Sequence, residues 1–568
     1  PADRVGGHLS IEVATLAQLM YARKHPEYMY VLTRDITIVD EIWNRSVSGI
    51  LNNTEAPLKD LKLCLNGHNL YVDTDMDIAS IFGDNCYICN CQSKDVTIKY
   101  LFDSSEGHNH HSDGSVMTIA YPAASTISNT KFHMYGNENG YINIEELYMP
   151  SMTENTLINL SEGDKLSMAY VNFKNIGNDN KSQLNTSLID APCEAYISTV
   201  SFTNIHQVLS SALKKNAHTR GQGILHFDDK GTKITQKIEH ATFNNISINR
   251  QYSSIITVGH TAVNSTMEGR SKFVIDRTSF TDATIGGRGA VAFVDVDGYR
   301  GDVSITNSTF SDIHPTLTPS TNEYDGGAIY ISNSDGYLNI EDNYFDNVGL
   351  ENSTSQLSYI SAMVGGIIYI GDTTRENLDR NPSHRPITIK NNKFYHGLAG
   401  KGGAIYMSNT ADITLENNEF KYNRANEGSA IYERYTIQGK RQGDTVVTDS
   451  VFEENGFDTN SSKGTYYIYA PENCNDPTLT FNNFHAIKNK GETSVLYMSF
   501  VASNSIINMY GDTLMTENEG GPVISMNTVS TNINKGTIKL HGSTTIATNT
   551  TADRYAITSA TKNVRCKF

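Results

Sequence analysis

The clearest regularity in the chain is a short apolar segment that recurs among polar residues. Its members share a phenylalanine with Asn, Asp, Ser or Thr within two residues, and successive members are 26 to 49 residues apart. They are Phe173, Phe202, Phe243, Phe280, Phe310, Phe345, Phe394, Phe420, Phe452 and Phe484, with Leu514 and Ile546 as expected continuations. Repeats at such intervals are typical of solenoids, in which each coil packs only on its neighbours. The shortest interval approximates one coil, and longer intervals indicate inserted loops.

Two further short segments accompany many of these phenylalanines. One is a Gly-Gly or Gly-Ser pair followed by a strand-like apolar run, at residues 326–331, 365–370, 402–407 and 428–432. The other alternates aliphatic and polar residues, at 303–306, 338–341, 387–390 and 413–416, as a strand with one buried face does. Three short strands per coil predict an all-β fold, a right-handed parallel β-helix. The alternative is a β-sandwich, which does not repeat the same motifs once per coil.

The packing of the coils follows from these motifs. The phenylalanines are expected to point inward and to stack in one column from Phe173 to Phe484. A glycine pair before a strand permits positive φ or close backbone approach at a sharp corner. Asn at the corner before Phe tolerates the left-handed conformation and can bond the Asn one coil away.

The first hundred residues have the pattern of a cap. Ser10 is expected to cap a short helix over residues 11–20, whose apolar spacing suits one face laid over the open end of the coils. Residues 30–38 and 61–70 are expected to be the first strands. The predicted organisation is an N-terminal cap with the first coils over 1–100, and β-helix coils with inserted loops over 101–568.

The composition and net charge of the chain exclude some classes of binding partner. The chain of 568 residues is 38% hydrophobic and 19% charged, with a net charge of −17 and no lysine or arginine block. Nucleic acid and anionic membranes require a basic face, so neither is an expected partner. The chain contains no run of 18 apolar residues, so no membrane-spanning segment is predicted. Because the chain opens at Pro1 without a signal-like segment, we expect a processed fragment whose signal or anchor lies elsewhere.

Short motifs resemble those of known surface proteins. Residues 30–38, followed by 63–68, resemble the opening coils of large cell-wall surface proteins of gut Gram-positive bacteria, which contain right-handed parallel β-helices. The Gly-Gly-Ala-Ile and Phe-x-x-Asn elements, the latter complete at 420–423 and 452–455, resemble those of chlamydial polymorphic membrane proteins, which are β-helical adhesins. These resemblances imply secretion, display at a cell surface and adhesion.

Catalytic and metal sites are weighed against this interpretation. Parallel β-helices of the pectin lyase-like class include lyases and hydrolases, which need converging carboxylates, or a basic residue often with calcium. The carboxylates here are scattered singly, so we predict no enzyme and no catalytic residue. Cys86, Cys89 and Cys91 lie near His108 in the sequence and could offer zinc ligands, but their spacing matches no closed four-ligand site. The cysteines could equally form a disulfide or be buried thiols. No metal or cofactor is therefore predicted.

Arg300-Gly301-Asp302 is the predicted binding site. The turn before Phe310 is three residues longer than the corresponding turn before Phe345, and the tripeptide falls in the extra length. An Arg-Gly-Asp sequence at a protruding turn can engage an integrin, with Asp completing a metal site on the partner. Chance alone gives such a match in roughly 7% of chains of this length, and many matches do nothing.

Two basic segments are further candidates. Residues 206–221, with Lys214, Lys215 and Arg220, and residues 372–385 could receive an acidic glycan, although solvated loops are the simpler interpretation. The expected function is an extracellular adhesin or display rod that binds host or neighbouring-cell proteins or glycans through loops. The alternatives are a subunit that self-associates into a fibre or sheath, and a polysaccharide lyase or hydrolase.

Overall fold

A computed structural model gives the conformation of most of the chain. It describes residues 4–5, 8–39, 60–73, 86–100, 131–145, 158–177, 187–207, 223–229, 232–248, 253–259, 271–286, 288–294, 301–316, 324–331, 336–351, 363–371, 386–409, 412–435, 443–456, 462–470, 478–500, 506–528, 537–551, 557–559 and 565–567. The chain divides into two compact units. Unit 1 comprises residues 1–230 and 234–250, and unit 2 comprises 231–233 and 251–568.

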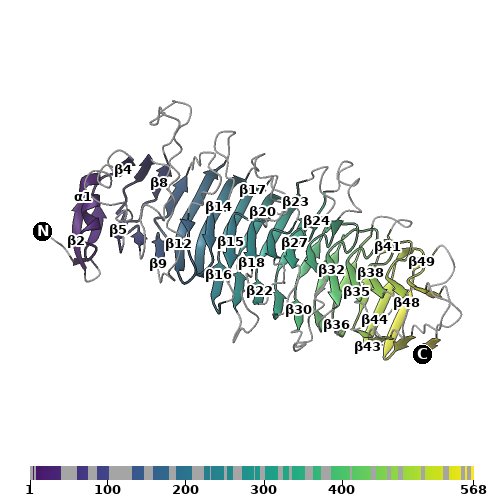
Figure 1. Cartoon of the computed structure of the whole chain (residues 1–568). Coiled ribbons are helices and arrows are strands. Elements are labelled where there is room, and N and C mark those ends of the chain that lie inside the picture. Colours follow the sequence, from purple (N-terminus) through teal and green to yellow (C-terminus); the bar gives the residue numbers. More distant parts are fainter. Residues whose placement is uncertain are drawn as a thin grey trace, which may run out of the picture. The chain divides into compact units, whose positions relative to one another are not determined.

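Unit 1 is built from strands that pair with strands of the next coil (Figure 1). Its described elements are β1 (Arg4–Val5), β2 (His8–Val13), α1 (Leu16–Met20), the 3₁₀ turn η1 (Tyr21–Arg23), β3 (Met29–Leu32), β4 (Ile36–Val39), β5 (Lys62–Cys64), β6 (Leu70–Asp73), β7 (Tyr87–Cys89), β8 (Val96–Tyr100), β9 (Lys131–Tyr135), β10 (Ile142–Glu145), β11 (Ile158–Asn159), β12 (Lys165–Ile176), β13 (Ile189–Ala191), β14 (Glu194–Gln207), β15 (Leu225–Asp228), β16 (Thr235–Glu239) and β17 (Thr242–Ile248).

Unit 2 arranges its strands in three main rows, each running from coil to coil. The first contains β19 (Lys272–Asp276), β22 (Asp302–Thr306), β26 (Leu338–Glu341), β30 (Ile387–Lys390), β33 (Ile413–Glu416), β36 (Thr445–Thr448), β39 (Thr478–Asn482), β43 (Ile506–Tyr510), β47 (Thr537–Leu540) and β51 (Arg565–Lys567). The second contains the phenylalanine strands β20 (Ser279–Ile285), β23 (Thr309–Pro315), β27 (Tyr344–Val348), β31 (Lys393–Tyr395), β34 (Glu419–Lys421), β37 (Val451–Glu453), β40 (His485–Ile487), β44 (Asp512–Thr516) and β48 (Ser543–Ala547).

The third row follows the glycine pairs. It contains β18 (Ile256–Gly259), β21 (Val291–Val294), β25 (Ile329–Ile331), β29 (Ile368–Ile370), β32 (Ile405–Asn409), β35 (Ile431–Tyr435), β38 (Tyr466–Ala470), β42 (Leu496–Phe500), β46 (Ile524–Thr528) and β50 (Ile557–Ser559). Short bridging strands are β24 (Tyr324–Asp325) with β28 (Met363–Val364), and β41 (Lys490–Gly491), β45 (Glu519–Gly520) and β49 (Thr550–Thr551). Neighbours in each row pair in parallel, which confirms an all-β parallel β-helix.

The N-terminal helix is confirmed, but its expected boundaries are wrong. Helix α1 (Leu16–Met20) begins after Thr15, whose hydroxyl accepts a hydrogen bond from the Gln18 amide while the Gln18 side chain accepts from the Thr15 amide. This reciprocal pair is a capping box. Residues 11–13 instead belong to β2, which pairs in parallel with β3. Ser10, the expected cap, lies in that strand opposite Met29.

The inward phenylalanine column is confirmed within each unit. In unit 1, Phe173, Phe202 and Phe243 stack with ring centroids 4.8 and 4.7 Å apart. In unit 2 the stack is Phe280, Phe310, Phe345, Phe394, Phe420 and Phe452, with spacings of 4.7 to 5.1 Å. All of these rings are fully buried. Spacings near the distance between paired strands show that one ring comes from each coil.

Toward its C-terminal end the expected column is wrong at Phe484 and Leu514 and confirmed at Ile546. Ala486, and not Phe484, pairs with Phe452, and the Phe484 ring lies tilted by 40° at 5.2 Å. The next members are Met515 and Ile546, because Met515 pairs with Ala486 and with Ile546. Leu514, the predicted member, takes the neighbouring outward position. The prediction followed the Asn-Phe pattern at 483–484, whereas the strand there begins one residue later.

Asparagines form a second column beside the inward residues of the second row, buried except at the half-buried last member, Asn549. Asn423, Asn455, Asn489, Asn518 and Asn549 each occupy the third position after the inward residue of the second row. From Asn455 onward, each side-chain oxygen accepts from the backbone and side-chain N–H of the Asn one coil earlier, at 2.9 to 3.1 Å. The Asn423 oxygen at the start of the column accepts from the Gly397 amide. A second set, Asn343, Asn392 and Asn418, does the same before the phenylalanines. The predicted contact of Asn with the Asn one coil away is therefore confirmed.

The glycine pairs serve both expected purposes. Gly365 has φ of +66°, which a side chain rarely adopts. A Cβ on Gly366 would lie 2.1 Å from the Gly403 carbonyl oxygen, so the coils approach each other too closely there for any side chain. The pair thus makes the corner before β29 and lets the next coil pack against it.

Candidate binding face on unit 2

Four neighbouring strands of the second row carry aromatic and charged side chains on their outer side. We call this set the binding face: Tyr344, Asp346, Tyr395, His396, Glu419, Lys421, Tyr422 and Glu453. The neighbouring residues Phe345, Phe394, Phe420 and Phe452 point into the core. Because successive side chains of a strand point to opposite faces, the residues beside these phenylalanines point away from the core. Register aligns Asp346, Tyr395, Lys421 and Glu453 in one row across β27, β31, β34 and β37.

Asp346 connects one half of the binding face. The Tyr344 hydroxyl donates to one Asp346 oxygen at 3.0 Å, and Nδ1 of His396 lies 2.7 Å from the other. Tyr344 meets Tyr395 edge to face at 5.6 Å, while the His396 ring stacks on Tyr422 at 5.0 Å. The Tyr344 and Tyr422 side chains are 36% and 39% exposed. This half therefore holds aromatic rings at the surface in fixed positions.

Glu419 and Lys421 connect the other half. The Tyr395 hydroxyl donates to a Glu419 oxygen at 2.6 Å, and the Lys421 ammonium bonds the second Glu419 oxygen. The same ammonium lies 2.9 Å from a Glu453 oxygen. The cation thus bridges carboxylates from two adjacent coils.

The protonation of this half follows from these contacts. Burial acts to raise the pKa of Glu419, but hydrogen bonds from Lys421 and Tyr395 hold it below the usual value. Hydrogen bonds to Glu419 and Glu453 raise the pKa of Lys421. Desolvation, followed by the bond to Asp346, raises the pKa of Tyr344. At neutral pH these groups are therefore an ionised carboxylate, an ammonium and a neutral phenol.

The chemistry of the binding face suits recognition of a polyhydroxylated ligand. Partly exposed rings offer apolar contact, while carboxylate oxygens and phenol hydroxyls accept and donate hydrogen bonds. The bonds within the face fix these groups before a ligand arrives, which lowers the entropy lost on binding.

On the preceding strand of the row, β23, the same positions carry none of the aromatic residues of the binding face. On β23 the corresponding outward residues are Thr309 and Ser311, with Asp312 at the following corner. Between residues 344 and 453 the residues beside the phenylalanines are Tyr, Asp, Lys and Glu, with Val451 as the one exception. That change is visible in the sequence, but the sequence motifs predict no role for the outward residues, so these residues are not among the candidates predicted from the sequence.

The third row carries a column of tyrosines, but their ring faces are not exposed as those of the binding face are. Tyr330, Tyr369, Tyr406, Tyr432, Tyr467 and Tyr497 stack from coil to coil at centroid distances of 4.8 to 5.2 Å. The ring faces therefore cover one another, and the Arg288 guanidinium lies 5.1 Å from the Tyr330 centroid at one end. We interpret this column as packing that stabilises the outer side of the row.

The predicted site, Arg300-Gly301-Asp302, lies at the start of β22. Arg300 falls outside the described residues. Gly301 is buried, and an Asp302 carboxylate oxygen accepts from the Tyr337 amide of the next coil at 3.0 Å. Asp35, Asp95 and Asp412 make the same bond, to the amides of Asn69, Tyr141 and Asp444. The Asp302 carboxylate thus occupies a recurring structural position, and integrin binding through it stays a prediction that this geometry does not favour.

A substitution separates the two roles of Asp302. Asp302→Asn keeps an oxygen that can accept from the Tyr337 amide, as the Asn69 side chain does for the Thr97 amide in unit 1, but removes the charge an integrin-bound metal would need. We expect integrin-dependent cell attachment to stay within about twofold of wild type and stability within about 0.5 kcal/mol. If attachment fell to background while the melting temperature stayed unchanged, the result would support Arg300-Gly301-Asp302 as an integrin-binding site.

The other sequence-based candidates lie mainly outside the described residues. This holds for residues 208–221 of the first basic segment, for the second basic segment, 372–385, and for His108. No helix among the described parts of the chain is long and apolar enough to cross a membrane. Comparison with known proteins finds no matching family model, no similar curated protein and no similar solved structure.

Proposed function

We propose that this protein is a secreted, cell-surface adhesin whose binding face on unit 2 holds glycans of a host or neighbouring cell without turning them over. The observation that carries the proposal is the hydrogen-bonded set of partly exposed rings and carboxylates on four adjacent coils, at positions that carry Thr and Ser on β23. Loops inserted between the strands would extend the contact, because loops on a rigid scaffold are frequent binding elements.

Two features support placing the protein outside the cell. Cys64 and Cys91 form a disulfide, a bond that persists mainly in oxidising compartments. The resemblance of its motifs to those of cell-wall surface proteins and β-helical adhesins also supports this location.

The charge of the protein bears on the kind of glycan. A net charge of −17 favours a neutral ligand over an acidic one, since acidic glycans would be repelled.

Removing the rings of the binding face tests the proposal. The triple variant Tyr344→Thr, Tyr395→Ser and Tyr422→Asn installs residue types found at the same positions of other coils, and Asn tolerates the positive φ of residue 422. A positive ligand is first identified for wild type on an array of neutral and acidic glycans. We expect its affinity to fall at least tenfold in the variant, because each lost ring removes about 0.5–1.5 kcal/mol of contact.

The matched control is Tyr337→Thr, which removes a ring that is 46% exposed and lies outside the binding face. Its affinity should equal that of wild type, and far-ultraviolet circular dichroism should show that both variants are folded. Equal loss in both variants, or none in the triple variant, would contradict the proposal. Binding only to proteins, ordered polymers in electron micrographs, or release of new sugar ends would favour a protein receptor, a fibre subunit or an enzyme respectively.

A further inference from the structure

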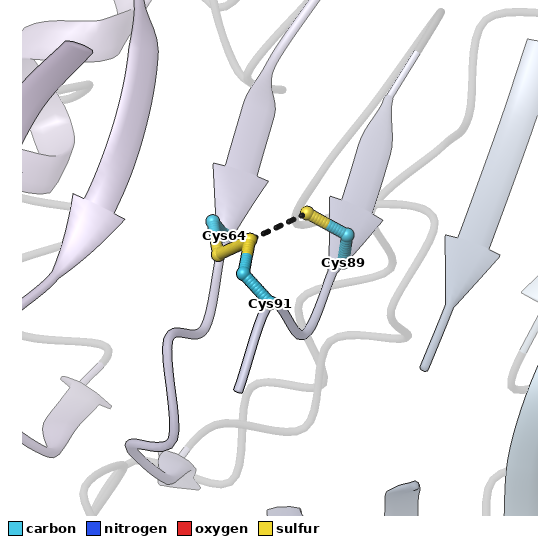
Figure 2. A group of neighbouring side chains, drawn as sticks. All are labelled: Cys64, Cys89 and Cys91. Atoms are coloured by element: carbon cyan, nitrogen blue, oxygen red, sulfur yellow. Dashed lines mark hydrogen bonds between the residues drawn. A yellow bond between two sulfur atoms is a disulfide. The ribbon is translucent and has the colours of Figure 1, made fainter. Parts of the chain in front are cut away.

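Three cysteines of unit 1 meet at one point, as Figure 2 shows. Cys64 ends β5 and Cys89 ends β7, and the parallel register of these strands makes the two residues direct partners. Cys91 follows two residues later and turns back toward them. The three sulfur atoms lie within 4.8 Å of one another, and those of Cys89 and Cys91 are 3.7 Å apart. Cys86, which the sequence grouped with Cys89 and Cys91, is replaced in this group by Cys64.

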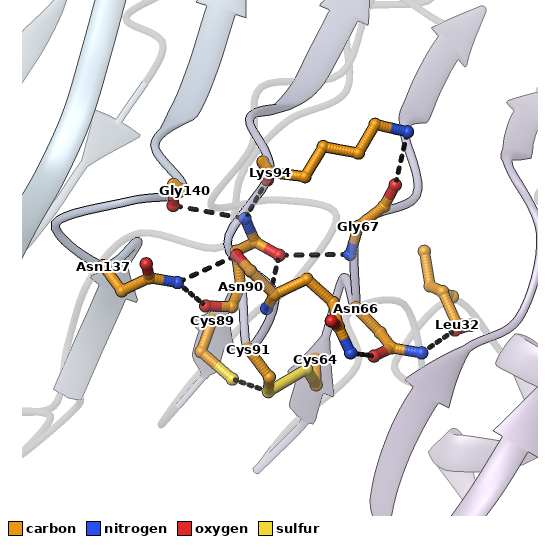
Figure 3. The surroundings of a disulfide bond; sticks show 11 residues. Leu32, Cys64, Asn66, Gly67, Cys89, Asn90, Cys91, Lys94, Asn137 and Gly140 are labelled. Atoms are coloured by element: carbon orange, nitrogen blue, oxygen red, sulfur yellow. Dashed lines mark hydrogen bonds between the residues drawn. A yellow bond between two sulfur atoms is a disulfide. The ribbon is translucent and has the colours of Figure 1, made fainter.

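The turn that carries Cys91 is held by bonds that do not involve sulfur (Figure 3). The Asn90 side chain donates to the carbonyls of Lys94 and Gly140, at 2.8 and 3.2 Å, and accepts from the Gly67 amide at 3.1 Å. The Gln92 side chain donates to Asn66 at 2.8 Å. Opening the Cys64–Cys91 disulfide would therefore leave Cys91 beside the other two cysteines.

The surroundings give the sulfur cluster a closed side and an open side. Cys64 and Cys89 are buried and pack with Met29, Val31 and Tyr135. Cys91 is exposed. A ligand bound by all three sulfur atoms would thus be covered by protein on one side and could reach solvent on the side of Cys91.

We propose that reduction of the Cys64–Cys91 disulfide creates a three-thiolate site on Cys64, Cys89 and Cys91 for one thiophilic metal ion such as Zn²⁺. Thiolates bind zinc at about 2.3 Å, so two of them on one tetrahedral ion lie about 3.8 Å apart. The present Cys89–Cys91 separation of 3.7 Å already suits such an ion. A fourth position toward solvent would be open to water, as in zinc sites that are not purely structural.

The electron and proton balance of this step is simple. An external dithiol or phosphine reductant supplies two electrons, and two protons complete the thiols of Cys64 and Cys91. Binding the ion then displaces the protons of the three thiols, so that three thiolates surround the metal. An external disulfide that takes two electrons from the Cys64 and Cys91 thiolates re-forms their bond, is itself reduced to two thiols after taking up two protons, and releases the ion, so disulfide and metal exclude each other. This inference does not depend on the proposed glycan binding.

The test is a titration of the full chain with Cd²⁺, a thiophilic probe whose thiolate complexes absorb in the ultraviolet. Protein reduced by a phosphine, freed of reductant under nitrogen, is expected to bind one equivalent at this cluster with a charge-transfer band. Cys89→Ser should weaken this binding at least tenfold, and Cys193→Ala, which removes a buried cysteine of unit 1 outside the cluster, should not. Oxidised wild type should show no band, and Zn²⁺ should displace Cd²⁺ from the reduced protein.

Cys89→Ser retains the two cysteines of the disulfide, so its fold can be verified in the oxidised form by mass spectrometry and circular dichroism before reduction. Should it fail to fold, Cys91→Ser provides the same test at an exposed position. The proposal is overturned if reduced wild type shows no Cd²⁺ band, if the oxidised protein binds equally well, or if both serine variants retain full affinity.

Discussion

Asn455→Ala is expected to destabilise unit 2 by about 3 kcal/mol or more, from the cost of buried polar groups left without partners. The Asn455 oxygen accepts from the backbone and side-chain N–H of Asn423, at 3.0 and 3.1 Å, and its amide donates to the Phe420 carbonyl at 2.9 Å. Asn423 and Asn455 are both fully buried. Water therefore has no easy access to replace the lost bonds.

The measurement is urea unfolding followed by far-ultraviolet circular dichroism, with the change in free energy taken from the shift of the midpoint. The control is Asn508→Ala, at an outward, half-buried position of β43, which should change stability by about 0.5 kcal/mol or less. Similar losses in the two variants would mean that the buried asparagine column contributes no more than an ordinary surface amide.

Phe394→Ala should cost about 3–5 kcal/mol, the usual range for deleting a buried aromatic side chain. Its ring is fully buried between Phe345 at 5.0 Å and Phe420 at 4.8 Å, nearly parallel to both. The neighbouring coils cannot close the gap, since their separation is fixed by backbone hydrogen bonds on either side. Phe394→Leu restores much of the volume and should cost less.

The same unfolding measurement tests this expectation, with Lys393→Ala as control. Lys393 precedes Phe394 on β31, points outward and is exposed, so its loss should leave stability nearly unchanged. If Phe394→Ala and Phe394→Leu were equally costly, shape and stacking would matter more than the cavity. If neither exceeded the control, the inward column would not be a main source of stability.

The fold could be predicted because its determinants are local. From Phe280 to Phe452 a phenylalanine beside polar residues points inward in each coil of unit 2, and the glycine pairs at 326–327, 365–366 and 402–403 make the same corner. The errors arose where two local patterns compete. Residues 11–13 have an alternation that suits a strand as well as a helix face, and the Thr15-x-x-Gln18 capping box, three residues apart, was the better signal for the helix start.

The binding face and the sulfur cluster depend on the register in which strands of neighbouring coils pair, and this register cannot be read from the sequence alone. Asp346 and Tyr395 become neighbours across 49 residues, whereas Tyr395 and Lys421 do so across 26, because inserted loops of different length separate the coils. Cys64 and Cys89 likewise meet only through the pairing of β5 with β7. Candidate residues far apart in the chain cannot be grouped until each coil has been aligned with the next.

The one-coil contact range of unit 2 has a mechanical consequence. Each strand of the three rows bonds only to the strand before and the strand after it, so the last coil that the structure describes, with β50 and β51, is bonded on one side to β46 and β47 alone. Tension applied to the chain would remove coils successively from an end, each extending the molecule by the length of its coil and loops. A stack of this kind absorbs work in many small steps, and coils in the middle of the unit stay folded while outer coils unfold.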